Sequence, residues 1–177
     1  GYLVSVSSGK YVNILVTEVA TSGNVDPVDE NEVANIAEFI KKGLNDAETV
    51  FTITGEVAVT YHNGQNLYIQ DATGSLLVYD GGSFGTDFRN GERLKGIKGT
   101  FKDYFSTYEM VADPSSFNPT SGEAVAPTVY TIENIVPEIQ NAYVAIENVT
   151  FDSANSRLID AIDAEIKIYN KFKIELP

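Results

Sequence analysis

Along the middle of the chain, apolar and polar side chains alternate with a period of two. Phe51, Ile53 and Val57 share one side of a segment that begins at Thr49, as expected of a strand with one buried face. Asn63-Gly64 then predicts a hairpin turn, because these two residues tolerate the positive φ angles that such a turn requires. Similar segments follow, and strands are expected at residues 49–60, 66–70, 75–79, 93–102 and 107–112.

Three strands joined by tight turns, then the long Gly-rich connection 80–91, then two more strands predict a five-stranded Greek-key barrel. This is the plan of oligonucleotide/oligosaccharide-binding (OB) folds. In the fourth strand Leu94 and Ile97 are three residues apart, so Gly96 is expected to form a β-bulge that keeps both side chains in the core. The bulge leaves three lysines on the outer face of this strand: Lys95, Lys98 and Lys102.

One short helix is predicted before the barrel. Asp29 is a suitable N-cap with Glu32 three residues later, and Gly43 provides the end of the helix. One apolar stripe at helical spacing is expected to pack on the barrel: Val33, Ile36, Ala37 and Ile40.

The chain is expected to divide into three parts. Residues 1–28 hold a β-hairpin, predicted from two apolar bursts, and a linker, while residues 29–113 hold the helix and the barrel. A loop rich in Pro, Ser, Gly and Thr follows. Residues 114–177 are interpreted as a partial second OB-like β unit, because residues 143–150 are similar to the first barrel strand. The predicted fold class is therefore all-β with one short helix.

A net charge of −13 bears on the partners that the chain can bind. Binding to nucleic acid depends strongly on Lys and Arg that neutralise phosphates, so an acidic chain is poorly suited to it. The charge is reversed locally, since five of the 12 basic residues lie close together: Arg89, Arg93, Lys95, Lys98 and Lys102. The chain has no cysteine, which excludes disulfides and thiolate metal sites.

The sequence contains no motif for catalysis or for a cofactor. The single histidine, His62, lies in a predicted turn without a nearby serine or cysteine to form a nucleophile and base, and is interpreted as a solvated turn residue. The acidic residues at 26–32 lack the spacing and central glycine of an EF-hand and are assigned to helix capping. We therefore expect a protein that is not an enzyme and that has no cofactor and no metal site.

Aromatic and basic side chains provide the best binding signal. They fall on the surface that OB folds use for ligands, the outer face of strands two and three with the adjoining loops. The candidates are Tyr61, His62, Tyr68 and Gln70, with Lys95, Lys98, Lys102, Tyr104 and Phe105 on the far side of that surface. Aromatic rings beside cations suit single-stranded nucleic acid. The same rings suit the apolar faces of sugars, and as a third alternative they pack between the two halves of the chain.

Several runs of residues resemble OB-fold domains in secreted and lipid-anchored proteins of the Bacteroides type: residues 34–40, 53–57, 66–74 and 77–79. The resemblance extends over about residues 33–112. It implies export to the periplasm or the cell surface, commonly in tandem barrels without an assigned activity, and some relatives are accessory modules beside secreted nucleases. Asp152-Ser153-Ala154 resembles the short O-glycosylation signal of such proteins.

The predicted function is a non-catalytic, exported OB-like binding or interaction module. A glycan or protein ligand is favoured, and the alternatives are a single-stranded nucleic-acid-binding accessory module and a structural spacer. A nucleic-acid module requires a continuous basic and aromatic groove over Tyr68, Lys95 and Lys98, whereas a spacer buries the aromatic rings and leaves no groove. No transmembrane segment is expected in this chain, because no stretch approaches the roughly 20 apolar residues that cross a bilayer.

Overall fold

The computed structural model describes residues 2–5, 11–14, 29–82 and 84–175. They belong to two compact units, residues 1–30 and 31–177, and each unit is described by itself. In the first unit β1 (Tyr2–Ser5) pairs antiparallel with β2 (Tyr11–Ile14), which confirms the predicted hairpin at these residues. A further division of the chain at residue 114 stays a prediction.

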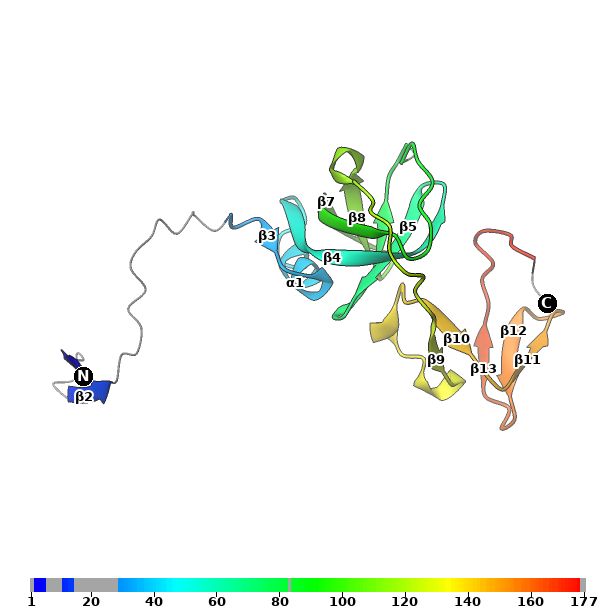
Figure 1. The fold of residues 1–177 in the computed structure, drawn as a ribbon. Coiled ribbons are helices and arrows are strands. Elements are labelled where there is room, and N and C mark those ends of the chain that lie inside the picture. The colour runs from blue at the N-terminus through cyan, green and yellow to red at the C-terminus, as the bar shows by residue number, and fades with distance from the viewer. Residues whose placement is uncertain (1, 6–10, 15–28, 83, 176–177) are drawn as a thin grey trace. The chain divides into compact units, whose positions relative to one another are not determined.

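A mixed five-stranded barrel forms the body of the second unit (Figure 1). Its strands are β4 (Val50–Asn63), β5 (Asn66–Asp71), β6 (Gly74–Tyr79), β7 (Arg93–Tyr104) and β8 (Thr107–Asp113). The order around the barrel is β4, β5, β6, β8 and β7, and β7 pairs with β4 to close it. β6 and β8 run parallel, and the other neighbours run antiparallel. The predicted five-stranded plan is confirmed, and the barrel is consistent with an OB-like fold.

The alternating pattern fills the barrel interior, and the register between β4 and β7 shifts opposite Gly96, with the extra residue on β4 and not on β7 as predicted. Ile53 pairs with Ile97 and Val57 pairs with Leu94, so four steps along β4 lie opposite three steps along β7. Gly96 has a φ of +69°, in the left-handed region that glycine adopts without a steric penalty. The irregularity places both Leu94 and Ile97 in the core, as the spacing of these residues predicts.

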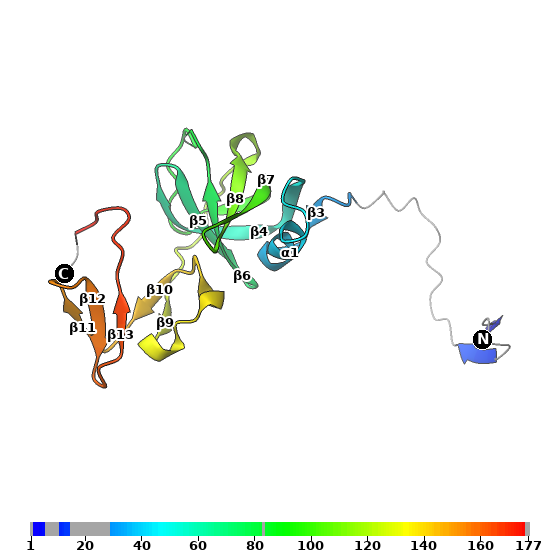
Figure 2. The ribbon, with the colours of Figure 1, turned by 180° about the vertical axis from the view of Figure 1, so that it is seen from behind.

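The α-helix α1 (Ile36–Gly43) closes one end of the barrel (Figures 1 and 2). Its Ile36 and Phe39 side chains are fully buried in the same core as the strands. Gly43 packs directly on the side chain of Phe101, where a Cβ atom would overlap the phenylalanine. The helix therefore needs both its apolar face and this glycine to sit against the strands.

The helix begins later than predicted, with Asn35 as its N-cap in place of Asp29. Asn35 accepts a hydrogen bond from the backbone N–H of Glu38 at 2.9 Å, and the Glu38 carboxylate accepts one from the N–H of Ala34 at 2.8 Å. The residues before Asn35 are extended because β3 (Glu32–Val33) pairs in parallel with β4. Both possible caps, Asp29 and Asn35, are followed three positions later by a glutamate. The pairing of β3 with β4 keeps the residues before Asn35 extended, so the helix begins after Asn35.

Replacing Asn35 by alanine is expected to lower the free energy of unfolding by about 1 kcal/mol, because an N–H in the first turn of α1 loses its acceptor. Asn35→Asp keeps an acceptor at the cap and is expected to remain close to the unaltered protein in stability. Urea denaturation measures both variants. Equal stability of the alanine and aspartate variants would contradict the assigned cap.

Short elements follow the barrel: η1 (Pro114–Ser116), β9 (Thr128–Tyr130), η2 (Ile132–Asn134), η3 (Pro137–Ile139), β10 (Val144–Ile146), β11 (Val149–Asp152), β12 (Arg157–Asp160) and β13 (Glu165–Lys167). β9 and β10 form a parallel pair, and β11, β12 and β13 form an antiparallel sheet. The strand predicted at 143–150 is divided, because Asn148 adopts a φ of 57° between β10 and β11. Small extra sheets thus follow the barrel, in agreement with the predicted partial β unit.

The predicted O-glycosylation signal lies at the turn between β11 and β12. Ser153 is exposed there. Asp152 accepts hydrogen bonds from Asn155 and Arg157, and these hold the pKa of its carboxyl below the ordinary value. Modification of Ser153 stays a prediction.

Candidate ligand-binding site

One row of outward side chains, the outer row, crosses all five strands of the barrel. Tyr61 of β4 lies opposite Tyr68 of β5, and Tyr68 lies opposite Leu77 of β6. Leu77 neighbours Glu109 of β8, which lies opposite Lys102 of β7. The strand register therefore brings two phenols, an apolar side chain, a carboxylate and an ammonium group into one line. This line lies on the face where OB folds bind ligands.

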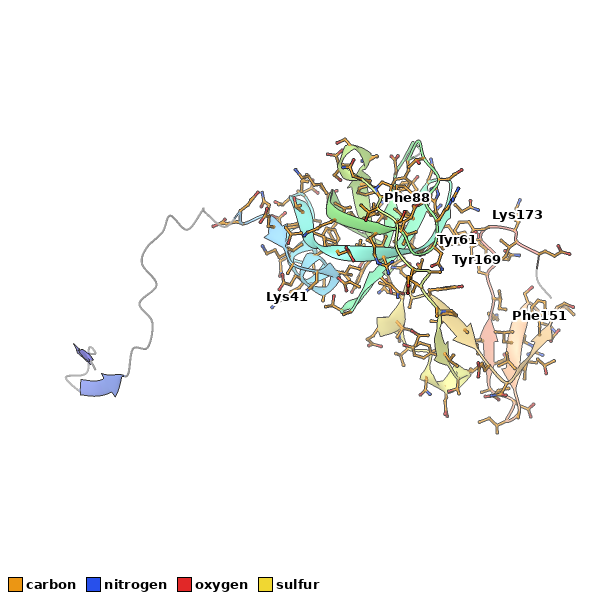
Figure 3. The ribbon with its side chains drawn as sticks, viewed as in Figure 1. Lys41, Tyr61, Phe88, Phe151, Tyr169 and Lys173 are labelled. Carbon is orange, nitrogen blue, oxygen red and sulfur yellow. The ribbon has the colours of Figure 1, made fainter. Side chains whose placement is uncertain are left out.

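The C-terminal segment, residues 168–174, crosses the outer row. The ring of its Phe172 lies 5.3 Å from the ring of Tyr61 and 6.3 Å from the ring of Tyr68. Figure 3 shows Tyr61 on the barrel beside this segment. Such ring separations are typical of favourable aromatic contacts. The chain thus places a phenylalanine of its own on the aromatic part of the outer face.

Two hollows adjoin the C-terminal segment. An apolar groove of about 280 Å³ is lined by Thr60, Tyr61, Tyr68, Asn141, Ala142, Tyr143, Phe172 and Ile174. A polar cleft of about 290 Å³ is lined by Gln65, Asn66, Tyr79, Lys102, Tyr104, Glu109 and Lys171. The polar cleft offers a carboxylate, ammonium groups, amides and phenols to a bound molecule, whereas the apolar groove offers mainly ring and alkyl surfaces.

The carboxylate of Glu109 is the distinctive group of the polar cleft. Glu109 is only 7% exposed, and no described residue gives its carboxylate a hydrogen bond or an ion pair. Burial raises the pKa of Glu109 above its ordinary value, while the charges of Lys102 and Lys171 act in the opposite direction. Its oxygens are not fully buried, but the low exposure of the residue partly removes the carboxylate from water, which is costly for a charged group. This one lines an open cleft, where it can accept hydrogen bonds from a bound molecule.

The turn between β7 and β8 forms an aromatic rim beside the polar cleft. Phe105 and Ser106 have φ angles of 50° and 66°, and Asp103 accepts a hydrogen bond from the N–H of Ser106 at 2.8 Å. The turn leaves Tyr104 half exposed and Phe105 88% exposed, with the two ring centres 4.7 Å apart. The ammonium group of Lys102 lies 4.6 Å from the centre of the Tyr104 ring. An exposed ring beside polar groups can stack on a flat apolar surface of a ligand.

Amide and hydroxyl groups complete the polar cleft. Gln65 donates a hydrogen bond from Nε2 to the carbonyl of Gly81 at 2.7 Å, and the Tyr79 hydroxyl donates to Oε1 of Gln65 at 3.4 Å. Asn66 Oδ1 accepts a hydrogen bond from Nζ of Lys171 at 2.8 Å. These bonds orient the amides within the cleft before any ligand arrives.

The predicted binding residues are only partly brought together. Tyr61 and Tyr68 contact each other, with ring centres 6.3 Å apart. Lys102 and Tyr104 line the polar cleft at the other end of the outer row. Gln70 lines a different hollow, beside the turn between β5 and β6.

The side chain of His62 is buried, and its interpretation as a solvated turn residue was wrong. Its side chain is 6% exposed and meets the rings of Phe84 and Phe88 edge to face, at 5.6 Å and 5.4 Å. Nδ1 accepts a hydrogen bond from the backbone N–H of Phe88 at 3.2 Å, so in the neutral ring Nε2 carries the proton and faces the carbonyl of Gly64 at 3.0 Å. The long loop after β6 therefore packs against the β4–β5 hairpin through the contacts of Phe84 and Phe88 with His62.

Lys95 and Lys98 lie on the outer face of β7, where this strand pairs with β4. Lys95 lies opposite Glu56, and Lys98 lies opposite Asp113 of β8. Acidic neighbours thus reduce the local positive charge. Tyr68 is on β5, which does not pair with β7, so the register separates it from these two lysines.

Sequence reasoning missed five residues of the polar cleft: Gln65, Asn66, Tyr79, Glu109 and Lys171. Glu109 carried a local signal, since it is a charged residue at an outward position between Tyr108 and Met110 in a predicted strand. Lys171 carried none, because only the fold brings the C-terminal segment to the barrel.

Comparisons with protein-family models, with curated proteins and with solved structures found no match. Within residues 29–82 and 84–175 and the hairpin strands, no helix is long and apolar enough to pass through a bilayer. The same described residues contain no group of three or more His, Cys, Asp or Glu side chains placed to hold a metal ion. The geometry of the polar cleft is therefore the basis for assigning a function.

Proposed function

We propose that the chain is a non-catalytic OB-like binding module whose polar cleft binds a glycan. The observation that carries the proposal is Glu109, a residue only 7% exposed whose carboxylate has no partner among the described residues and opens into a cleft beside an exposed tyrosine ring. We also propose that the module works outside the cytoplasm, at the cell surface or in the periplasm, as the resemblance implies.

The functional groups of the polar cleft match those of a sugar. A sugar hydroxyl both donates and accepts hydrogen bonds, so it pairs with the acceptor Glu109, with the donor Lys102 and with the amides of Gln65 and Asn66. The ring of Tyr104 offers a flat surface to the C–H face of a pyranose. Hydrogen bonds to charged groups contribute about 1.5–3 kcal/mol each, enough for specific recognition of hydroxyl positions.

Binding is a better match than cleavage for this cleft. Glycoside hydrolysis usually needs two carboxyl groups on either side of the bond that is broken. Glu109 is the one acidic residue among the described side chains that line the cleft. The net charge of −13 disfavours nucleic acid as the ligand of this chain.

A glycan array that includes cellohexaose, mannohexaose and chitohexaose, probed with the full chain at low salt, tests the proposal. We expect binding to at least one class of neutral glycan, and we expect Tyr104→Ala to weaken it about tenfold through loss of ring stacking, equivalent to about 1.4 kcal/mol. Phe151→Ala on the β11–β13 sheet is not expected to change it.

A parallel titration with single-stranded DNA separates the alternatives. DNA binding that weakens steeply with salt and disappears in Lys98→Glu would support the nucleic-acid function in place of the glycan function. Absence of binding to both kinds of ligand would support a structural spacer.

A further inference from the structure

Lys171 reaches the polar cleft from a segment that is remote from it in sequence. Its ammonium group contacts Asn66 and acts electrostatically on Glu109, so it belongs to the same group of side chains as Lys102. The next residue in the chain, Phe172, is seated on Tyr61 and Tyr68. The two residues therefore attach the C-terminal segment to the aromatic end of the outer row and to the polar cleft.

We propose that Phe172 is a positioning residue that holds Lys171 in the polar cleft, so that glycan binding and docking of the C-terminal segment strengthen each other. The inference rests on the proposed function. Lys171 contacts the glycan when the segment is docked, and Phe172 acts through Lys171 without touching the glycan.

The shape of the C-terminal segment makes this coupling direct. Asn170 and Ile174 exchange two hydrogen bonds, from Asn170 Nδ2 to the Ile174 carbonyl at 2.7 Å and from the Ile174 N–H to Asn170 Oδ1 at 3.0 Å. They close residues 170–174 into a short loop. The N–H of Ile168 donates to the carbonyl of Ser156 at 2.7 Å, which fixes the start of the segment. Because Phe172 and Lys171 are neighbours in this closed loop, the position of the Phe172 ring on the two tyrosines also fixes the position of Lys171.

The contacts with the outer row are few enough for the segment to dock and release. Phe172 contacts the rings of Tyr61 and Tyr68, and Lys171 donates one hydrogen bond to Asn66 in the polar cleft. Tyr169, three residues before Phe172, is 87% exposed. A glycan that contacts Lys171 must favour the docked state by the same factor by which docking favours the glycan.

Amide hydrogen exchange of residues 169–174 in the glycan-free full chain tests the docking. Phe172→Ala is expected to increase exchange in this segment about tenfold, because both ring contacts are lost. Tyr169→Ala removes an exposed ring from the same segment and serves as the matched control, with exchange expected to stay unchanged. Equal exchange in the two variants would overturn the role of Phe172.

A double-mutant cycle tests the coupling, with cellohexaose, mannohexaose and chitohexaose as probes. Lys171→Met and Phe172→Ala are each expected to weaken binding of the bound hexasaccharide about tenfold, and the double variant is expected to lose no more than either single one. Phe172→Tyr keeps the ring and is expected to restore binding. Losses that multiply to about a hundredfold would show that Phe172 acts independently of Lys171 and would overturn the inference.

The two proposals fail in different ways. If the unaltered chain binds no glycan, the proposed function is wrong and the coupling falls with it. If the unaltered chain binds a hexasaccharide and Phe172→Ala binds it as tightly, the proposed function stands and the inference alone is wrong.

Discussion

Phe39→Ala is expected to lower the free energy of unfolding by about 3–5 kcal/mol, a large part of the stability of an ordinary domain. Phe39 is fully buried on the inner face of α1. Its ring centre lies 6.3 Å from that of Phe51 and 6.1 Å from that of Phe101, so it joins the helix to both β4 and β7. Truncation would remove these contacts and leave a cavity where the helix closes the barrel.

Phe105→Ala is the matched control, because it is the same substitution at a residue that is 88% exposed. Its effect on stability is expected to stay within about 0.5 kcal/mol. Chemical denaturation followed by circular dichroism measures both variants. A small loss in Phe39→Ala would mean that the helix does not close the barrel core.

Glu109→Gln is expected to weaken glycan binding about 10- to 100-fold and, at the same time, to stabilise the fold. The loss of affinity follows from removing a charged acceptor, since hydrogen bonds to charged groups contribute about 1.5–3 kcal/mol. The gain in stability follows from removing a carboxylate whose pKa is raised by partial burial and which has no partner among the described residues. A residue kept at a cost to stability is typical of a functional site.

The stability effect has a definite pH dependence. In the unfolded chain Glu109 titrates near its ordinary pKa of 4.5, and in the folded chain burial raises that pKa. Below pH 4.5 the carboxyl is mostly protonated in both states, so it has little effect on stability. As the pH rises through the folded-state pKa, the folded state must ionise a buried group and loses stability relative to the unfolded state.

Thermal unfolding at pH 4 and pH 7 measures this effect. Glu109→Gln is expected to raise the Tm by about 2 °C at pH 7, the shift that somewhat less than 1 kcal/mol produces in a chain of this length, and to leave it unchanged at pH 4. Glu133→Gln, at an exposed position in η2, is the control and should show no such difference. Destabilisation by Glu109→Gln at pH 7 would mean that the carboxylate serves the fold.

The barrel could be predicted from the sequence because the signals for each of its strands and turns lie in residues that are close together in the chain. The alternation around Ile53, the Asn63-Gly64 turn and the spacing of Leu94 and Ile97 across Gly96 depend on neighbouring residues alone. Binary patterning of this kind fixes which side of a strand is buried, and with it which lysines face outward.

The polar cleft could be predicted only in part, because it is assembled from distant segments. Lys102 and Tyr104 were identified from the lysine pattern of one strand and the turn after it. The burial of the His62 side chain depends on Phe84 and Phe88 in the long loop. Lys171 lies in a segment that contacts the barrel through Phe172 and Tyr61, which are far apart in the chain.

The start of the helix shows the same limit at short range. Two N-cap signatures, at Asp29 and at Asn35, compete within seven residues. The pairing of residues 32–33 with β4 decides between them, and that pairing is a tertiary contact. Local propensity gives way wherever such a contact fixes the backbone.

An NMR titration of the isotope-labelled full chain with the hexasaccharide that it binds most tightly tests the central claim, that the polar cleft is the ligand site. The largest changes in backbone amide shifts are predicted at residues 65–66, 102–104 and 109, with smaller changes in the C-terminal segment. Changes centred on Lys95 and Lys98, or no changes at millimolar hexasaccharide, would contradict it.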